Sequence, residues 1–155
     1  MSASLILLER ASRWAGAFRR EMRKLPGEGE IPLCEVRSLA QCQRELKASP
    51  HSVVGVEVLP KNLVETLRGI SDLARRFPHA CWIALAARGL EPYELQLREA
   101  GAIHALFSPR ALSTTLRLVC CHLARAPEPQ LSLEEAIWSK LPWQSAAKDL
   151  AQGQI

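Results

Sequence analysis

Five polar residues lie where an apolar run of the sequence ends, and they could form one site if the runs are neighbouring strands. Two carboxylates, two guanidinium groups and a hydroxyl could bind a polar ligand or carry out a reaction. The loop from Glu9 to Ser12 is not rich in glycine, serine or threonine, which counts against a flavin or nucleotide as the ligand. The five residues are Glu9, Arg10, Glu57, Arg88 and Ser108.

The five cysteines do not form a metal-binding or redox motif. Their number is odd, and no two have Cys-x-x-Cys spacing. Cys120, Cys121 and His122 are adjacent, and neighbouring helical residues point about 100° apart, so they do not converge on one ion. Cys34 and Cys81 lie inside apolar runs, where cysteine acts as a small hydrophobic residue. We expect no metal, no cofactor and a reducing, cytoplasmic environment.

The length and composition indicate one soluble domain. The chain has 155 residues, of which 48% are hydrophobic and 23% are charged, with a net charge of +4. No apolar run approaches the roughly 20 residues that span a bilayer, and the first residues lack the basic region of a signal peptide. We therefore expect a cytoplasmic protein with no membrane partner.

Short apolar runs alternate with amphipathic, helix-like segments along the chain. This alternation predicts a parallel sheet covered by helices on both faces, in which strands buried on both sides are apolar throughout. The predicted strands are Leu5–Leu8, Ile31–Val36, Ser52–Val58, Cys81–Ala86 and Ile103–Phe107, and the predicted helices are 11–25, 39–48, 63–77, 92–100 and 112–123.

The chain divides at a proline-rich break into a domain and a tail. Residues 1–126 form the predicted (βα)₅ unit, and 127–155 form a linker and an amphipathic tail. Ser132 and Glu135 have capping-box spacing, which predicts a short C-terminal helix. Trp138, Leu141 and Trp143 are candidates for an interaction, since tryptophan is enriched at binding hot spots. Burial of both rings against the chain's own domain is an equally good interpretation.

Two stretches resemble the receiver domain of bacterial response regulators, which has a flavodoxin-like fold. Residues 82–87 are similar to the family's fourth strand, and Ala100-Gly101-Ala102 through Ser108-Pro109 is similar to its fifth strand and the Lys-Pro that follows. The resemblance covers roughly residues 4–124. It implies a doubly wound sheet of five parallel strands and a role in signal transduction through a phosphorelay.

The family's phosphorylation chemistry depends on residues that this chain replaces. In the family, two acidic residues after the first strand hold Mg²⁺, and an aspartate in the third strand accepts the phosphoryl group. Here the acidic pair falls on Glu9 and Arg10, and a cation at Arg10 would repel Mg²⁺. The acceptor position falls on Glu57, or on Val56 in a register shifted by one residue.

The remaining positions of the family's pocket also differ. The hydroxyl at the end of the fourth strand falls on Ala86, and the switch aromatic of the fifth strand falls on Ala105. The phosphate-pairing lysine falls on Ser108, although Pro109 is retained, and the resemblance implies a cis peptide between them. We interpret the set as a degenerate phosphorylation pocket formed by Glu9, Arg10, Glu57, Ala86, Ser108 and Pro109.

Glu57 allows three interpretations. It could mimic a phosphorylated aspartate, with its carboxylate reaching toward Arg10. It could be a polar residue at a strand end that water or a helix N-terminus satisfies. A buried cluster of Glu9, Arg10 and Glu57 is an intermediate case, and such ion pairs are weak evidence for stability or function.

We therefore predict a non-phosphorylatable, receiver-like interaction module without enzymatic activity. Its partners would be proteins, including a second copy of the chain that pairs through residues 91–100 and 110–125, as receiver domains commonly do. The alternatives are a flavodoxin-like ligand-binding or enzymatic domain, and an adaptor that binds nucleic acid through the basic first helix. The charge of that helix could also meet an acidic lipid surface or an acidic partner. A solvated helix face is the commoner explanation of that charge, which counts against nucleic acid. The helix carries Arg10, Arg13, Arg19, Arg20, Arg23 and Lys24 against Glu21.

Overall fold

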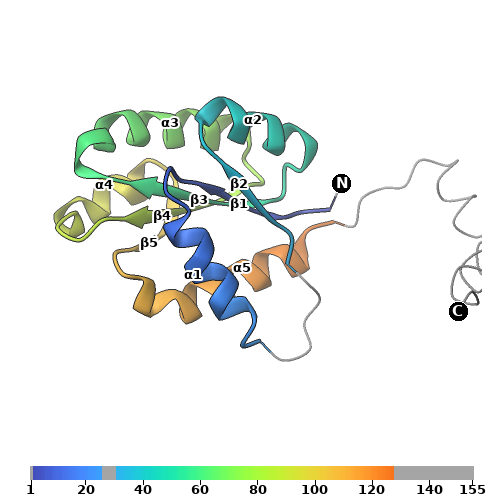
Figure 1. Cartoon of the computed structure of the whole chain (residues 1–155). Helices are drawn as coiled ribbons and strands as arrows, with labels where there is room; N and C mark the ends of the chain where they lie inside the picture. The colour runs from blue at the N-terminus through green and yellow to red at the C-terminus, as the bar shows by residue number, and fades with distance from the viewer. Residues whose placement is uncertain (1, 26–30, 128–155) are drawn as a thin grey trace, which may run out of the picture.

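The computed structural model describes residues 2–25 and 31–127, which form alternating strands and helices (Figure 1). The expected tail helix and the candidates Trp138, Leu141 and Trp143 lie outside the described residues. In the described part, no helix is both long and apolar enough to cross a bilayer. The strands are β1 (Leu5–Leu8), β2 (Leu33–Val36), β3 (Val53–Val58), β4 (Cys81–Ala86) and β5 (Ala102–Leu106). The helices are α1 (Arg13–Met22), α2 (Leu39–Ala48), α3 (Leu63–Arg76), α4 (Glu94–Glu99) and α5 (Leu112–Arg125), with single 3₁₀ turns at Pro60–Asn62, Glu91–Tyr93 and Pro109–Ala111.

The five strands form one parallel sheet in the order β2-β1-β3-β4-β5. The chain moves outward from β1 to β2, crosses back to β3, and continues to β4 and β5. This is the doubly wound (βα)₅ arrangement that the sequence predicted. The carboxyl ends of β1 and β3 adjoin at the point where the winding direction reverses, because Leu8 pairs with Val56 across these two strands.

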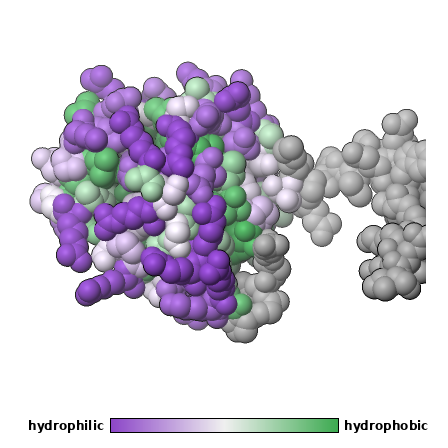
Figure 2. Space-filling view, viewed as in Figure 1, coloured by the Kyte–Doolittle hydropathy of each residue, from purple (hydrophilic) through white to green (hydrophobic). Residues whose placement is uncertain are grey.

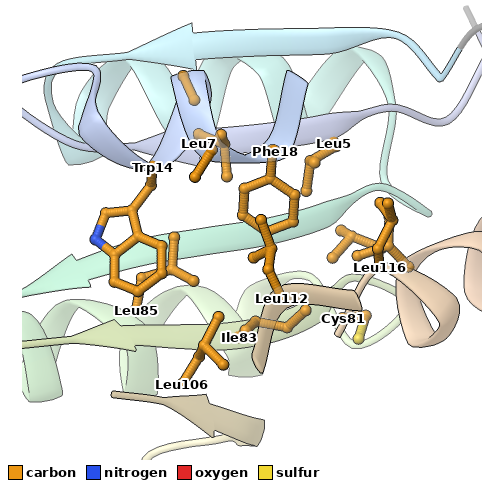
Figure 3. Packing of buried hydrophobic residues seen from close by; sticks show 14 residues of the cluster. Leu5, Leu7, Trp14, Phe18, Cys81, Ile83, Leu85, Leu106, Leu112 and Leu116 are labelled. Carbon is orange, nitrogen blue, oxygen red and sulfur yellow. The ribbon is translucent and has the colours of Figure 1, made fainter. Parts of the chain in front are cut away.

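Helices cover both faces of the sheet, and each strand alternates its side chains between them. On one face α1 and α5 bury Trp14, Phe18, Leu112 and Leu116 against the sheet (Figure 3). On the other face α2 and α3 pack on a second cluster, and α4 covers a third near β5. Burial on both faces explains why β1 is apolar at every position.

Local signals in the sequence set several element boundaries. The Ser38 hydroxyl accepts a hydrogen bond from the backbone N–H of Gln41 and caps α2. Gly101 follows α4 with a φ of +122°, where a Cβ would lie 2.9 Å from that of Ala74, so glycine is required at this turn. Pro109 opens a 3₁₀ turn, and no peptide bond in the described residues is cis, so the bond before Pro109 does not have the cis form that the resemblance implied.

Candidate functional site

Glu9, at the carboxyl end of β1, caps the N-terminus of α1 instead of facing solvent. Its side chain is 2% exposed, and its two carboxylate oxygens accept the backbone N–H groups of Trp14 and Ala15 at 2.8 and 2.7 Å. These are the second and third residues of the helix, whose N–H groups an N-cap side chain normally satisfies. Ser12 occupies the N-cap position but makes no such bond. Glu9 therefore replaces the cap and neutralises the positive end of α1.

A charged network fixes the loop between β1 and α1. The Ser12 hydroxyl donates to the Glu35 carboxylate at 2.7 Å, and Arg37 donates to the Ser12 oxygen at 2.7 Å. Arg37 also donates to the backbone carbonyl of Glu9 at 2.8 Å, and Arg19 pairs with Glu35 at 2.6 Å. These bonds hold Ser12 in the left-handed region, with φ 52° and ψ 21°, which costs a non-glycine residue roughly 1–2 kcal/mol.

Glu35 makes the stability of this loop dependent on pH. The hydrogen bond from Ser12, followed by that from Arg19, lowers the pKa of the Glu35 carboxyl below its ordinary value. A lowered folded-state pKa contributes stability above the unfolded-state pKa, and the contribution is lost as the pH falls through the folded-state pKa.

Substitution of Glu35 by glutamine should therefore reduce stability at neutral pH by about 1 kcal/mol. The difference from the wild type should disappear in acid, and urea unfolding at a series of pH values measures it. Glu45→Gln, at an exposed position of α2 outside this network, is the control and should show little difference at any pH. A Glu35→Gln deficit that is independent of pH would contradict the assignment.

A cavity of about 360 Å³ opens at the carboxyl ends of β1 and β3, beside the N-terminus of α2. Arg10 and Arg37 line it together with Glu57 and Glu65, so the wall carries both signs of charge. Thr66, whose side chain carries a hydroxyl group, also lines the cavity and is buried. The full lining is residues 8–10, 37–40, 56–57, Asn62, Glu65 and Thr66.

The structure brings Glu9, Arg10 and Glu57 to this cavity without joining them as an ionic cluster. Arg10 is exposed and Glu57 is half-buried, and within the described residues neither side chain has an ion-pair partner. The phosphate-mimic interpretation has the Glu57 carboxylate reaching toward Arg10. No hydrogen bond or ion pair joins these two side chains. Val56, the alternative acceptor position, is buried in the cluster beneath α2 and α3. Of the two positions, only Glu57 brings a polar side chain to the cavity.

The other positions assigned to the degenerate pocket lie outside the cavity lining. Ala86 is buried at the end of β4. Ala105, at the position of the family's switch aromatic and not part of the pocket, is buried in β5. The Ser108 hydroxyl accepts a bond from the backbone N–H of Arg110 at 3.3 Å and caps the 3₁₀ turn that begins at Pro109. The cavity is therefore displaced toward α2 from the position that the resemblance implied.

The two buried cysteines are unreactive thiols, and the described residues form no metal-binding cluster. Burial raises the pKa of the Cys42 thiol to about 12 and that of Cys81 to about 11, so both remain protonated. His51 stacks on His79 with ring centroids 4.8 Å apart. Across residues 2–25 and 31–127, no three histidine, cysteine or acidic side chains are placed to hold a metal ion.

Sequence reasoning missed the residues that organise this edge most strongly. Arg37 and Glu35 belong to the strand end at β2, and Asn62 caps the turn after β3 by accepting the backbone N–H of Leu59 at 2.7 Å. Arg37 carried a usable signal, because it follows a predicted strand just as Glu9 and Arg10 do. No signal in the sequence indicated the hydrogen bond between Glu35 and Ser12, because these two residues lie 23 positions apart in the chain.

The strand order, with α1 and α5 on one face and α2, α3 and α4 on the other, is the fold of a response-regulator receiver domain. No family model matches the sequence, and no curated protein matches it significantly.

Several solved structures share this fold. A CheY-like protein, TadZ from Pseudomonas aeruginosa, is 16% identical, with a TM-score of 0.60 over 76% of this chain and 99% of the other. A protein named for pilus assembly, CpaE from Burkholderia thailandensis, is 23% identical, with a TM-score of 0.56 over 78% and 99%. An atypical orphan response regulator, described as having a phosphorylation-independent regulatory mechanism, is 16% identical, with a TM-score of 0.58 over 79% and 96%. At these identities the similarity concerns the fold.

Proposed function

We propose that this chain is a receiver-like protein–protein interaction module of bacterial signalling that works in the cytoplasm without phosphorylation or catalysis. The observation that carries the proposal is the use of Glu9. Both oxygens of the carboxylate that would bind Mg²⁺ in a receiver domain accept backbone N–H groups of α1. A metal ion bound by this carboxylate would deprive the two N–H groups of their acceptor, and Arg10 places a positive charge beside the site.

The interaction surface of this proposal is the side of the molecule formed by α4, β5 and α5. Of the five exposed large hydrophobic residues in the described chain, four lie on these elements or on the turn before α4. Both helices contact β5, which is an edge strand of the sheet. The four are Leu95 (63% exposed), Ile103 (53%), Tyr93 (43%) and Leu118 (39%). We call this surface the α4–β5–α5 patch.

The polar groups around the α4–β5–α5 patch favour association through side chains over association through strand pairing. Arg98 donates to the backbone carbonyl of Ile103 at 3.2 Å and pairs with Glu94 at 2.8 Å, so it occupies a carbonyl at the sheet edge. Burial lowers the pKa of His104, with a contribution from Arg98, so this imidazole is neutral at physiological pH. The patch is thus an apolar surface rimmed by charges, as at many protein interfaces.

Sedimentation velocity of the full chain over a range of concentrations tests the homodimer. A concentration-dependent increase in the sedimentation coefficient is expected, and a monomer at every concentration would overturn the homodimer.

A heterologous protein partner is a second form of the proposal. Because one structurally similar protein is named for pilus assembly, components of such an assembly are the first partners to test.

Phosphorylation is tested with small phosphodonors. After incubation with acetyl phosphate and Mg²⁺ we expect no added phosphoryl mass, and with beryllofluoride and Mg²⁺ we expect no thermal stabilisation. Intact-mass spectrometry and a thermal-shift scan measure these outcomes, and a receiver domain with a complete acidic pocket is the positive control. A Mg²⁺-dependent adduct on this chain would refute the proposal.

Ligand binding in the cavity is the second candidate function. The cavity lies where doubly wound folds bind ligands, and it places the unpaired Arg10 and Glu57 beside the first N–H groups of α2. Stabilisation by inorganic phosphate without Mg²⁺, lost in Arg10→Ala, would support this function. Absence of any effect would leave the interaction module as the better account.

A further inference from the structure

The surface formed by α1, the turn before α5, and α5 concentrates the positive charge of the chain. Residues 13–25 and 109–125 contain eight of the twenty Lys and Arg residues and only one of the sixteen Asp and Glu residues. The other described residues contain ten basic and nine acidic side chains, so they are nearly neutral. We call this surface the α1–α5 face, and it is the opposite side of the sheet from α2 and α3 (Figure 1).

Most of the cations on the α1–α5 face are available to a partner. Two of the eight are engaged, since Arg19 pairs with Glu35 and Lys24 pairs with Glu21. Figure 2 shows hydrophilic side chains on the lower part of the visible face, where α1 lies in Figure 1, as well as on its upper edge. Six arginines are exposed and have no ion-pair partner within residues 2–25 and 31–127, and they are Arg13, Arg20, Arg23, Arg110, Arg117 and Arg125.

We propose that the α1–α5 face is a docking surface for an anionic lipid membrane. Arginines spread over two helices that lie side by side can meet many phosphate groups of a planar surface at once. Such binding is peripheral and needs no membrane-spanning segment. It departs from the expectation of no membrane partner, which rested on the lack of an apolar run long enough to span a bilayer. This inference rests on charge, whereas the interaction proposed for the α4–β5–α5 patch rests on exposed apolar residues, and the two surfaces share α5.

The shape and composition of the α1–α5 face favour a membrane over nucleic acid. A major groove about 12 Å wide admits one α-helix of about 10–12 Å diameter, whereas α1 and α5 are packed together on the sheet. Binding of single strands relies on exposed aromatic rings, and the two aromatic residues of these helices, Trp14 and Phe18, are buried.

The composition of the face also argues against a protein partner. Protein interfaces depend on apolar anchors, and the exposed large hydrophobic residues include only one on these two helices, Leu118 at 39%. The chain's own remaining segments are insufficient occupants. Residues 1, 26–30 and 128–155 carry six acidic and two basic side chains, too few to neutralise eight cations opposed by one acid.

The test is co-sedimentation of the full chain with vesicles of phosphatidylcholine alone or mixed with phosphatidylglycerol. The wild type should bind only the mixed vesicles, and binding should weaken steeply as salt is added. The triple variant Arg13→Glu, Arg20→Glu and Arg117→Glu should bind at least about a hundredfold more weakly, since each basic residue near such a surface contributes roughly 1 kcal/mol.

A matched control variant distinguishes the effect of the α1–α5 face from the effect of the lower net charge. Arg44→Glu, Arg68→Glu and Arg76→Glu change the same number of exposed, unpaired arginines on α2 and α3, and this variant should lose far less binding than the first. Circular dichroism and thermal melting verify that both variants fold. Equal loss in the two variants, or no binding of the wild type to mixed vesicles, would overturn the proposal. Tighter, equally face-dependent binding to duplex DNA in the same buffer would also overturn it.

Discussion

Replacing Glu9 with alanine is expected to lower the free energy of unfolding by about 3 kcal/mol. The substitution leaves the N–H groups of Trp14 and Ala15 without acceptors inside the protein, and each buried unsatisfied donor costs about 1–3 kcal/mol. It also removes a negative charge from the N-terminus of α1. Urea unfolding followed by circular dichroism measures the loss, and amide exchange should show that α1 opens first.

Two further variants make this prediction specific. Glu9→Gln keeps one acceptor oxygen in place, so its loss should be about half that of alanine. Glu65→Ala removes an exposed carboxylate at the same cavity, and it should change stability by no more than about 0.5 kcal/mol. If Glu9→Ala were as stable as the wild type, Glu9 would be free to bind a cation, and the main support for a non-phosphorylatable module would be lost.

The fold could be predicted from the sequence because burial on both faces leaves a strong signal. β1, β3 and β4 are apolar at nearly every position, which few structures other than central parallel strands require. The edge strands were placed less accurately. The run 31–36 begins two residues before β2, and the run 103–107 is shifted by one residue from β5, because side chains at a sheet edge are only partly buried.

The candidate site was harder to predict because its geometry depends on side-chain bonds between distant loops. The sequence placed Glu9 at the end of a strand, and the structure agrees, but strand position does not show that the carboxylate turns back onto α1. That direction follows from Ser12, whose hydroxyl is engaged by Glu35 and Arg37 and is not used as the cap. Residue type indicated that Glu9 belongs to a degenerate phosphorylation pocket, whereas the local competition for hydrogen bonds made Glu9 a helix cap.

Substitution of Leu95 or Ile103 by glutamate is expected to weaken self-association through the α4–β5–α5 patch by at least about thirtyfold each. A buried interface residue of the hot-spot type contributes 2 kcal/mol or more, and a carboxylate at that position must also be desolvated. Leu95 is 63% exposed in the single chain, so its substitution should leave the unfolding free energy within about 0.5 kcal/mol of the wild type. Sedimentation equilibrium measures the association constant, and thermal melting verifies the fold.

Val64→Glu is the matched control for this prediction. Val64 is 62% exposed, almost the same as Leu95, but it lies on α3 and is not part of the α4–β5–α5 patch. The model of association therefore requires this variant to dimerise like the wild type. If Val64→Glu and Leu95→Glu weakened association equally, added charge would be the cause. If neither did, the exposed apolar residues of α4 and β5 would have to serve a different partner.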